Sequence, residues 1–237
     1  MPRRLVLFDV DGTLIDTGGA GRLAVEQAFR SVFDVDPTVP RDGVRFAGMT
    51  DPAIFLAQAR ALGIASEVYE ARRASLQNAY FIALSAEMER NDPRRRVLPG
   101  VLPLLEDLAR RDDVELGLLT GNFERGARIK LGPFGLNRFF AGGGFGSDDA
   151  DRAAIARIAR EKIARVTGQA FEPARVVVVG DTEHDVTCAR ANGFRAVAVE
   201  SGWVAREVLE RAAPDALLAD LSDLGAALRA LDLAPTR

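Results

Sequence analysis

Two aspartates near the N-terminus are the residues of this sequence best placed to do chemistry. Asp9 and Asp11 follow the apolar residues 5–8 and precede Gly12. A continuous apolar run is typical of a strand buried on both faces of a parallel sheet. Because side chains alternate along a strand, residues at i and i+2 point the same way. Two carboxylates held this close favour a bound cation, or a proton on one of them. A strand that ends in an ordinary Asp-Gly turn would give the same pattern.

Two further apolar runs also end in polar residues. Residues 114–119 precede Thr120-Gly121-Asn122, and residues 176–179 precede Gly180-Asp181, with Asp185 four positions later. In a parallel sheet the carboxyl ends of the strands share one edge, and ligands bind there. Converging aspartates in a chain with only two lysines predict a site for a hard cation with oxygen ligands, Mg²⁺ first among them. Thr120-Gly121-Asn122 also fits the N-terminal cap of a helix.

The elements that must position these residues fall into two blocks. Helical periodicity dominates residues 17–97, with helices expected at about 23–33, from 51, and at 66–89, and no clear strand. From residue 98 onward helices alternate with apolar strands at 114–119, 139–145, 176–181, 195–199 and 216–218. This alternation predicts a parallel sheet with right-handed crossovers. We therefore expect an α/β fold, a Rossmann-like parallel sheet with helices on both faces in residues 1–16 and 98–237, and an all-helical domain inserted at 17–97.

Composition narrows the class of protein. The chain has 237 residues, of which 48% are hydrophobic and 27% charged, and its net charge is −3. These values fit a globular protein and argue against nucleic acid or a membrane surface as the main partner. No apolar stretch approaches the ~20 residues of a membrane span. Cys188 is the sole cysteine, which excludes an intramolecular disulfide and fits a reducing compartment. We expect a cytoplasmic protein; no feature indicates an oligomeric state.

Together these motifs resemble the haloacid dehalogenase (HAD) superfamily. The resemblance rests on Phe8-Asp9-Val10-Asp11-Gly12-Thr13-Leu14, the later threonine at a strand end, and Gly180-Asp181-Thr182-x-x-Asp185. The resemblance covers essentially the whole chain, in order. Within the superfamily, the chain is similar to phosphoglycolate-phosphatase-like members, which have a helical cap domain after the first strand. It implies a HAD-type phosphoric monoester hydrolase. Such an enzyme would be a Mg²⁺-dependent phosphatase that hydrolyses a small phosphorylated metabolite, phosphoglycolate-like or a sugar phosphate, through an aspartyl-phosphate intermediate.

The resemblance also implies roles at the strand ends. Asp9 would be the nucleophile, and Asp11 would protonate the leaving oxygen and then deprotonate the hydrolytic water. Mg²⁺ would be bound by a carboxylate oxygen of Asp9, the backbone carbonyl of Asp11 and the side chain of Asp181. Asp185 would hold the water shell of the metal or orient a basic residue.

Further family positions concern the substrate. Thr120 and the backbone N–H groups of Gly121 and Asn122 would bind the transferring phosphoryl oxygens. By analogy with capped members, Arg45 and Thr50 are expected to contact the leaving group. The alternative at this second position is a helix N-cap by Thr50 or Asp51.

The sequence departs from the family at the third motif. Relatives usually have a lysine at a helix start before the last acidic strand, and here that region reads Asp149-Ala150-Asp151-Arg152. We assign the role to Arg152, because a guanidinium is always charged and neutralises phosphate. The alternative is a surface arginine paired with Asp148 or Asp149. Lys130 is the competing cation, but its place in the preceding helix predicts a solvated side chain.

Other functions remain in competition with hydrolysis. A β-phosphoglucomutase-like phosphotransferase would share Asp9 and Asp11, and a non-catalytic ligand-binding protein could use the same fold. A dehalogenase would not need the acid at Asp11. A phosphonatase would need a cap lysine, and residues 17–97 contain none.

Overall fold

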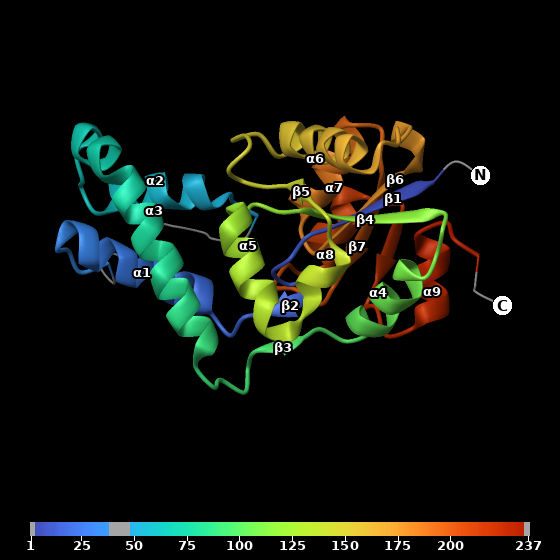
Figure 1. The fold of residues 1–237 in the computed structure, drawn as a ribbon, viewed down its shortest axis with the longest axis horizontal. Coiled ribbons are helices and arrows are strands. Elements are labelled where there is room, and N and C mark those ends of the chain that lie inside the picture. The colour runs from blue at the N-terminus through green and yellow to red at the C-terminus, as the bar shows by residue number, and fades with distance from the viewer. Residues whose placement is uncertain (1–2, 38–47, 235–237) are drawn as a thin grey trace.

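The computed structural model describes residues 3–37 and 48–234. Figure 1 shows a sheet with helices on both sides and, next to it, a group of three helices that we call the helical cap (α1, α2 and α3). The cap is inserted between the first strand of the sheet and the rest of it. This is the α/β architecture with a helical insert that the sequence predicts.

Within the described residues, the main sheet has six parallel strands in the order β5-β4-β1-β6-β7-β8. Their bounds are β1 Arg4–Phe8, β4 Val114–Leu119, β5 Gly143–Gly144, β6 Val176–Gly180, β7 Arg195–Val199 and β8 Ala216–Leu218. The first strand is central: Phe8 lies opposite Leu118 on one side and Val179 on the other. All strands point the same way, so the residues that follow β1, β4 and β6 gather at one edge.

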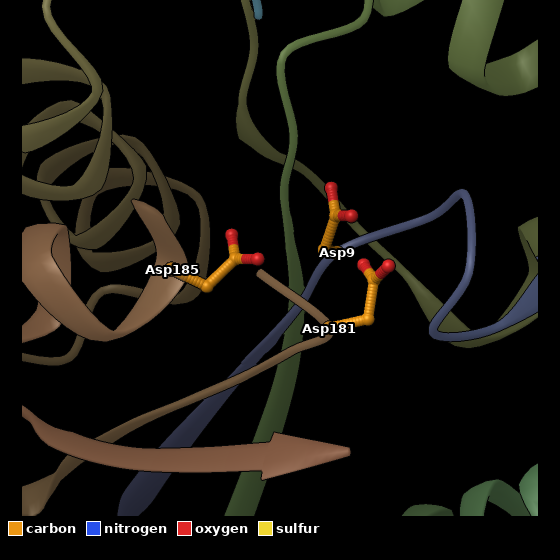
Figure 2. A group of neighbouring side chains, drawn as sticks. All are labelled: Asp9, Asp181 and Asp185. Carbon is orange, nitrogen blue, oxygen red and sulfur yellow. The ribbon is translucent and has the colours of Figure 1, made fainter. Parts of the chain in front are cut away.

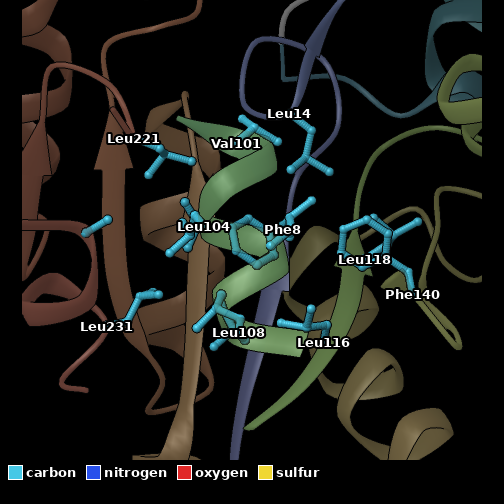
Figure 3. Packing of buried hydrophobic residues seen from close by; sticks show 14 of the residues in the cluster. Phe8, Leu14, Val101, Leu104, Leu108, Leu116, Leu118, Phe140, Leu221 and Leu231 are labelled. Carbon is cyan, nitrogen blue, oxygen red and sulfur yellow. The ribbon is translucent and has the colours of Figure 1, made fainter. Parts of the chain in front are cut away.

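Helices cover both faces of this sheet, and the alternation along β1 shows why. Val6 and Phe8 belong to a core shared with α4 (Val101–Ala109), α5 (Glu124–Leu131) and α9 (Leu224–Ala230). Figure 3 shows Phe8 surrounded by side chains of this core. Leu5 and Leu7 face a second core with α6 (Arg152–Thr167), α7 (Glu183–Ala191) and α8 (Arg206–Ala212). Burial of each large apolar side chain contributes about 1.5–3 kcal/mol, so both cores hold β1, and with it Asp9, in place.

The helical cap has a core of its own. It consists of α1 (Ala20–Phe33), α2 (Asp51–Ala61) and α3 (Ser66–Glu89), which meet around Phe29, Phe55 and Tyr80. Phe123, from the loop after β4, joins them edge-to-face with its ring 5.4 Å from that of Phe55. The cap therefore packs on the loop that follows β4. None of the helices in residues 3–37 and 48–234 combines the length and apolar character needed to cross a lipid bilayer.

Two segments differ from the sequence prediction. Arg96–Val97 forms a short strand, β3, antiparallel to β2 (Ile15–Asp16), so the two linkers to the cap lie side by side. Two residues are too few to show a strand period. The strand expected at 139–145 shrinks to Gly143–Gly144, because Phe140 packs against Phe8 instead of continuing a ladder. Short 3₁₀ helices occupy Gly132–Phe134, Leu136–Phe139 and Pro173–Arg175.

Candidate active site

Three buried carboxylates meet at the sheet edge. Asp9 follows β1, Asp181 follows β6, and Asp185 lies in the first turn of α7. One oxygen from each lies within 4.8 Å of the others, and Figure 2 shows the three groups around a common space. Strand order thus brings together three of the four aspartates for which the sequence predicts metal contacts. The carboxylate of the fourth, Asp11, has different partners, described below.

Two glycines make room for Asp181. Gly12 has φ +82°, and a Cβ there would lie 2.4 Å from Oδ2 of Asp181. A Cβ at Gly202 would lie 1.7 Å from the same oxygen, and the hydroxyl of Thr13 donates to Oδ1 at 3.4 Å. Both the left-handed backbone and the close approach require glycine at position 12. The Asp-Gly-Thr sequence after β1 is therefore shaped around the Asp181 carboxylate.

The carboxylates of this cluster repel one another. Burial, together with the neighbouring carboxylate of Asp185, raises the pKa of Asp9 to about 7, although Arg152 opposes the rise. Burial and then the charge of Asp9 raise the pKa of Asp181 well above its usual value. Buried acids with raised pKa values hold protons unless a cation replaces them. The all-oxygen donor set fits a hard divalent cation such as Mg²⁺.

Asp185 connects the cluster to Arg152. Its Oδ2 accepts hydrogen bonds from the backbone N of Thr182 at 3.1 Å and from the hydroxyl of Thr182 at 2.7 Å. Its Oδ1 accepts one from Nη2 of Arg152 at 2.5 Å, and Nη1 of the same guanidinium donates to the carbonyl of Gly48 at 3.2 Å. The side chain of Arg152 is only 14% exposed. It is thus a largely covered cation at the carboxylate cluster and not a surface residue paired with Asp148 or Asp149.

The carboxylate of Asp11 binds residues that follow β4. Its Oδ2 accepts hydrogen bonds from Nδ2 of Asn122 at 2.8 Å and from Nζ of Lys130 at 2.6 Å. The same Nδ2 donates to the hydroxyl of Thr120 at 2.8 Å. Thr120 and Asn122 therefore lie beside Asp11, as the convergence of strand ends predicts, and Lys130 joins them.

The expectation that Lys130 is solvated is wrong. Its side chain is 6% exposed, and Nζ also donates to Oδ1 of Asn122 at 2.6 Å. The physical reason is its register on α5: Phe123, Ala127, Lys130 and Leu131 are all buried. The spacing i, i+4, i+7, i+8 marks one helix face. A lysine in line with apolar residues of that face was the signal available in the sequence.

Asp51, at the start of α2, binds the cap to the loop after β4. Its backbone N donates to the carbonyl of Gly121 at 2.7 Å, and its Oδ2 accepts from the backbone N of Phe123 at 2.8 Å. Burial raises the pKa of Asp51 to about 6, against the pull of Lys130. A Cβ at Gly121 would lie 2.4 Å from the carbonyl oxygen of Met49. The sequence offered Asp51 as a possible helix cap or as part of a loop that contacts the leaving group, and it did not predict these bonds to the loop after β4.

These groups line a cavity of about 670 Å³, a size typical of small-molecule sites. From the sheet side it is lined by Asp9, Asp11, Thr120, Gly121, Asn122, Lys130, Arg152 and Asp181. From the cap side and the linkers it is lined by residues that include Arg22, Val25, Asp51, Ile54, Tyr80, Arg94 and Arg96. Thr50 is not among the lining residues; its hydroxyl accepts from the backbone N of Ala53 at 3.4 Å and caps α2. Arg45 lies outside the described residues.

Known proteins are similar to this chain in sequence and in fold. Phosphoglycolate phosphatase from Synechococcus elongatus is 31% identical over 224 residues, which are 92% of this chain and 94% of that protein. Tyrosine-protein kinase PtkA from Mycobacterium tuberculosis is 30% identical over 202 residues, 84% of this chain and 62% of that protein. The solved structure of CbbY from Rhodobacter sphaeroides in complex with phosphate has the same fold, with a TM-score of 0.73, 22% identity and coverage of 98% and 100%.

A family model matches the greater part of the chain. It covers residues 3–193 and describes a haloacid dehalogenase-like hydrolase. That span contains all three strand ends, the three clustered carboxylates and the whole helical cap. The sequence motifs, the sheet topology and the match agree, and the chain belongs to the haloacid dehalogenase-like hydrolase family.

Proposed function

We propose that this protein is a Mg²⁺-dependent phosphatase that hydrolyses a small phosphomonoester through an aspartyl-phosphate on Asp9. The observation that carries the proposal is the division of labour among the aspartates. Asp9 lies in the three-carboxylate cluster, whereas the carboxylate of Asp11, two residues later, is bound by Asn122 and Lys130. The first carboxylate is thus suited to binding a cation and attacking phosphorus. The second is held outside the cation cluster, and we assign it to proton transfer.

In the first half-reaction, an oxygen of Asp9 attacks phosphorus and the bond to the leaving oxygen breaks while Asp11 gives that oxygen a proton. In the second, Asp11 takes a proton from the water that attacks the aspartyl-phosphate, and Asp9 is released. Mg²⁺, held by Asp9, Asp181 and the backbone carbonyl of Asp11, would neutralise charge on the phosphoryl oxygens. Arg152, which Asp185 orients, supplies positive charge close to Asp9.

The phosphoryl oxygens need donors as well as cations. Thr120 and the backbone N–H groups of Gly121 and Asn122 lie at the end of β4 and line the cavity, so we assign them to these oxygens. The helical cap closes the cavity from the other side and would keep bulk water away from the aspartyl-phosphate. Val25, Ile54 and Tyr80 give the cap side an apolar surface, to which Arg22, Arg94 and Arg96 add positive charge. The arginines suit a compact anionic metabolite such as phosphoglycolate or a sugar phosphate.

The test is turnover of p-nitrophenyl phosphate and of a panel of phosphometabolites that includes 2-phosphoglycolate. Protein stripped with EDTA should be inactive and should regain activity with Mg²⁺, whereas Asp9→Asn should stay inactive under both conditions. Beryllofluoride should bind the wild type with Mg²⁺ and not Asp9→Asn. Metal-independent turnover, or turnover by Asp9→Asn, would refute the proposal. Phosphate that appears on a second substrate and not in solution would indicate a phosphotransferase.

A further inference from the structure

The active-site cavity is lined by two cations with different partners, the buried Lys130 and the partly buried Arg152. Arg152 binds Asp185, and the next carboxylate that acts on its charge is Asp9. Lys130 binds Asp11, and the next carboxylate that acts on its charge is Asp51 of the cap. The two cations are therefore hydrogen-bonded to different aspartates, although the charge of Asp9 acts on both. A single phosphate-neutralising group accounts for one of them and leaves Lys130 without a function.

Lys130, Asn122 and Asp11 form a closed triangle of hydrogen bonds. Nζ of Lys130 donates to Oδ2 of Asp11 and to Oδ1 of Asn122, both at 2.6 Å. Nδ2 of Asn122 donates to the same Asp11 oxygen at 2.8 Å. Each of these three side chains is therefore hydrogen-bonded to the other two. An ammonium group has three donors, and this triangle uses two of them.

The surroundings of Lys130 keep it at this place. Burial opposes its charge, but Asp11 and Asp51 outweigh burial, so the pKa of Lys130 lies above its ordinary value. On the cap side, Gly21 lies next to the ammonium group: a Cβ there would be in ordinary van der Waals contact with Nζ, at 3.4 Å. Lys130 therefore occupies the junction between the sheet edge and the first turn of α1.

We propose that Lys130 is a positioning residue that acts through Asp11. With Asn122 it holds the Asp11 carboxylate on the leaving-group side of the cavity, apart from the three carboxylates around the cation. The inference rests on the proposed phosphatase function. Proton transfer requires the acid within hydrogen-bond reach of the leaving oxygen, and side chains of this kind depend on supporting contacts for their geometry. Lys130 keeps its own protons throughout; the proton that reaches the leaving oxygen comes from Asp11.

The experiment compares two leaving groups in Lys130→Met, Lys130→Arg and the control Lys162→Met. Lys162 is the other lysine of the chain and pairs with Asp148 outside the cavity lining. p-Nitrophenolate leaves without a proton, whereas the alkyl phosphate that the wild type hydrolyses fastest needs one. In Lys130→Met, kcat for the alkyl phosphate should fall about 10- to 100-fold, part of the ~10²–10⁴-fold that a general acid contributes.

For p-nitrophenyl phosphate the loss should be several-fold smaller, and KM should stay near the wild-type value for both substrates. Lys130→Arg should restore part of the lost alkyl phosphatase activity, and Lys162→Met should match the wild type. In an Asp11→Asn background, Lys130→Met should lower kcat for the alkyl phosphate little further, because the residue through which Lys130 acts is already disabled. Thermal unfolding checks that each variant folds, and Lys130→Gln replaces Lys130→Met if the latter does not.

Two results would overturn the inference while leaving the phosphatase proposal intact. One is a raised KM with equal losses of kcat on both substrates, which would mean that Lys130 contacts the phosphoryl group. The other is a full, multiplicative loss in the Asp11→Asn background. A wild type that hydrolyses neither substrate with Mg²⁺ would instead refute the proposed function and this inference with it.

Discussion

Asp9→Asn should make the metal-free protein more stable while it abolishes turnover. The carboxylate of Asp9 is buried beside Asp185 and Asp181, and its pKa is raised from 3.8 to about 7. Between these two values the folded state binds a proton that the unfolded state has released. Stability therefore falls as pH rises from about 4 to about 7, and the full penalty persists above pH ~7. Asparagine carries no charge at any pH in this range and avoids the penalty.

The magnitude follows from the difference between the two pKa values. One pKa unit corresponds to about 1.36 kcal/mol, so a rise from 3.8 to about 7 gives at most about 4 kcal/mol at pH ~8. At pH ~5 only about 1–2 kcal/mol of that penalty has developed. The advantage of Asp9→Asn should therefore grow by roughly 2–3 kcal/mol between these pH values. For a chain of this length, about 4 kcal/mol raises Tm by on the order of 10 °C.

The assay is thermal unfolding in EDTA at about pH 5 and about pH 8, with Asp112→Asn as the control at an exposed aspartate. Added Mg²⁺ should stabilise the wild type more than Asp9→Asn, because a cation that binds the folded state removes the repulsion. The reasoning fails if Asp9→Asn is no more stable than the wild type at pH ~8. It also fails if the gap narrows as pH rises.

Two further variants test the remaining roles. Asp11→Asn should lower kcat by about 10²–10⁴-fold for alkyl phosphates and much less for p-nitrophenyl phosphate; steady-state kinetics with both substrates decides, and equal losses would remove Asp11 from the acid role. Arg152→Ala should raise KM and lower kcat together, and it should cost about 3–5 kcal/mol of stability because it leaves the buried carboxylate of Asp185 without its charge partner. Arg152→Lys should recover much of the lost activity and much of the lost stability, as measured by steady-state kinetics and urea unfolding. If Arg152→Ala is less stable but has unchanged kinetics, the role of Arg152 is limited to orienting Asp185.

The sequence alone was sufficient for the three strands that carry the site and for the carboxylates near their ends. The apolar runs of β1, β4 and β6 predict buried parallel strands, and parallel strands put their carboxyl ends on one side. Asp9 and Asp181 meet there for that reason, and Asp185 joins them from the first turn of α7. The place of Arg152 also followed from the order of elements, since it starts the helix before β6. These are consequences of local patterns and chain order.

Only the tertiary structure showed which residues far apart in the sequence bind one another. Lys130 binds Asp11 over a separation of 119 residues, and Asp51 binds Phe123 over 72. Periodicity shows that Lys130 shares a face with buried residues, but it does not show which polar group that face meets. That depends on how α5 packs against α3 of the cap. Contacts of this kind are set by the packing of whole elements, and no local pattern of residues encodes them.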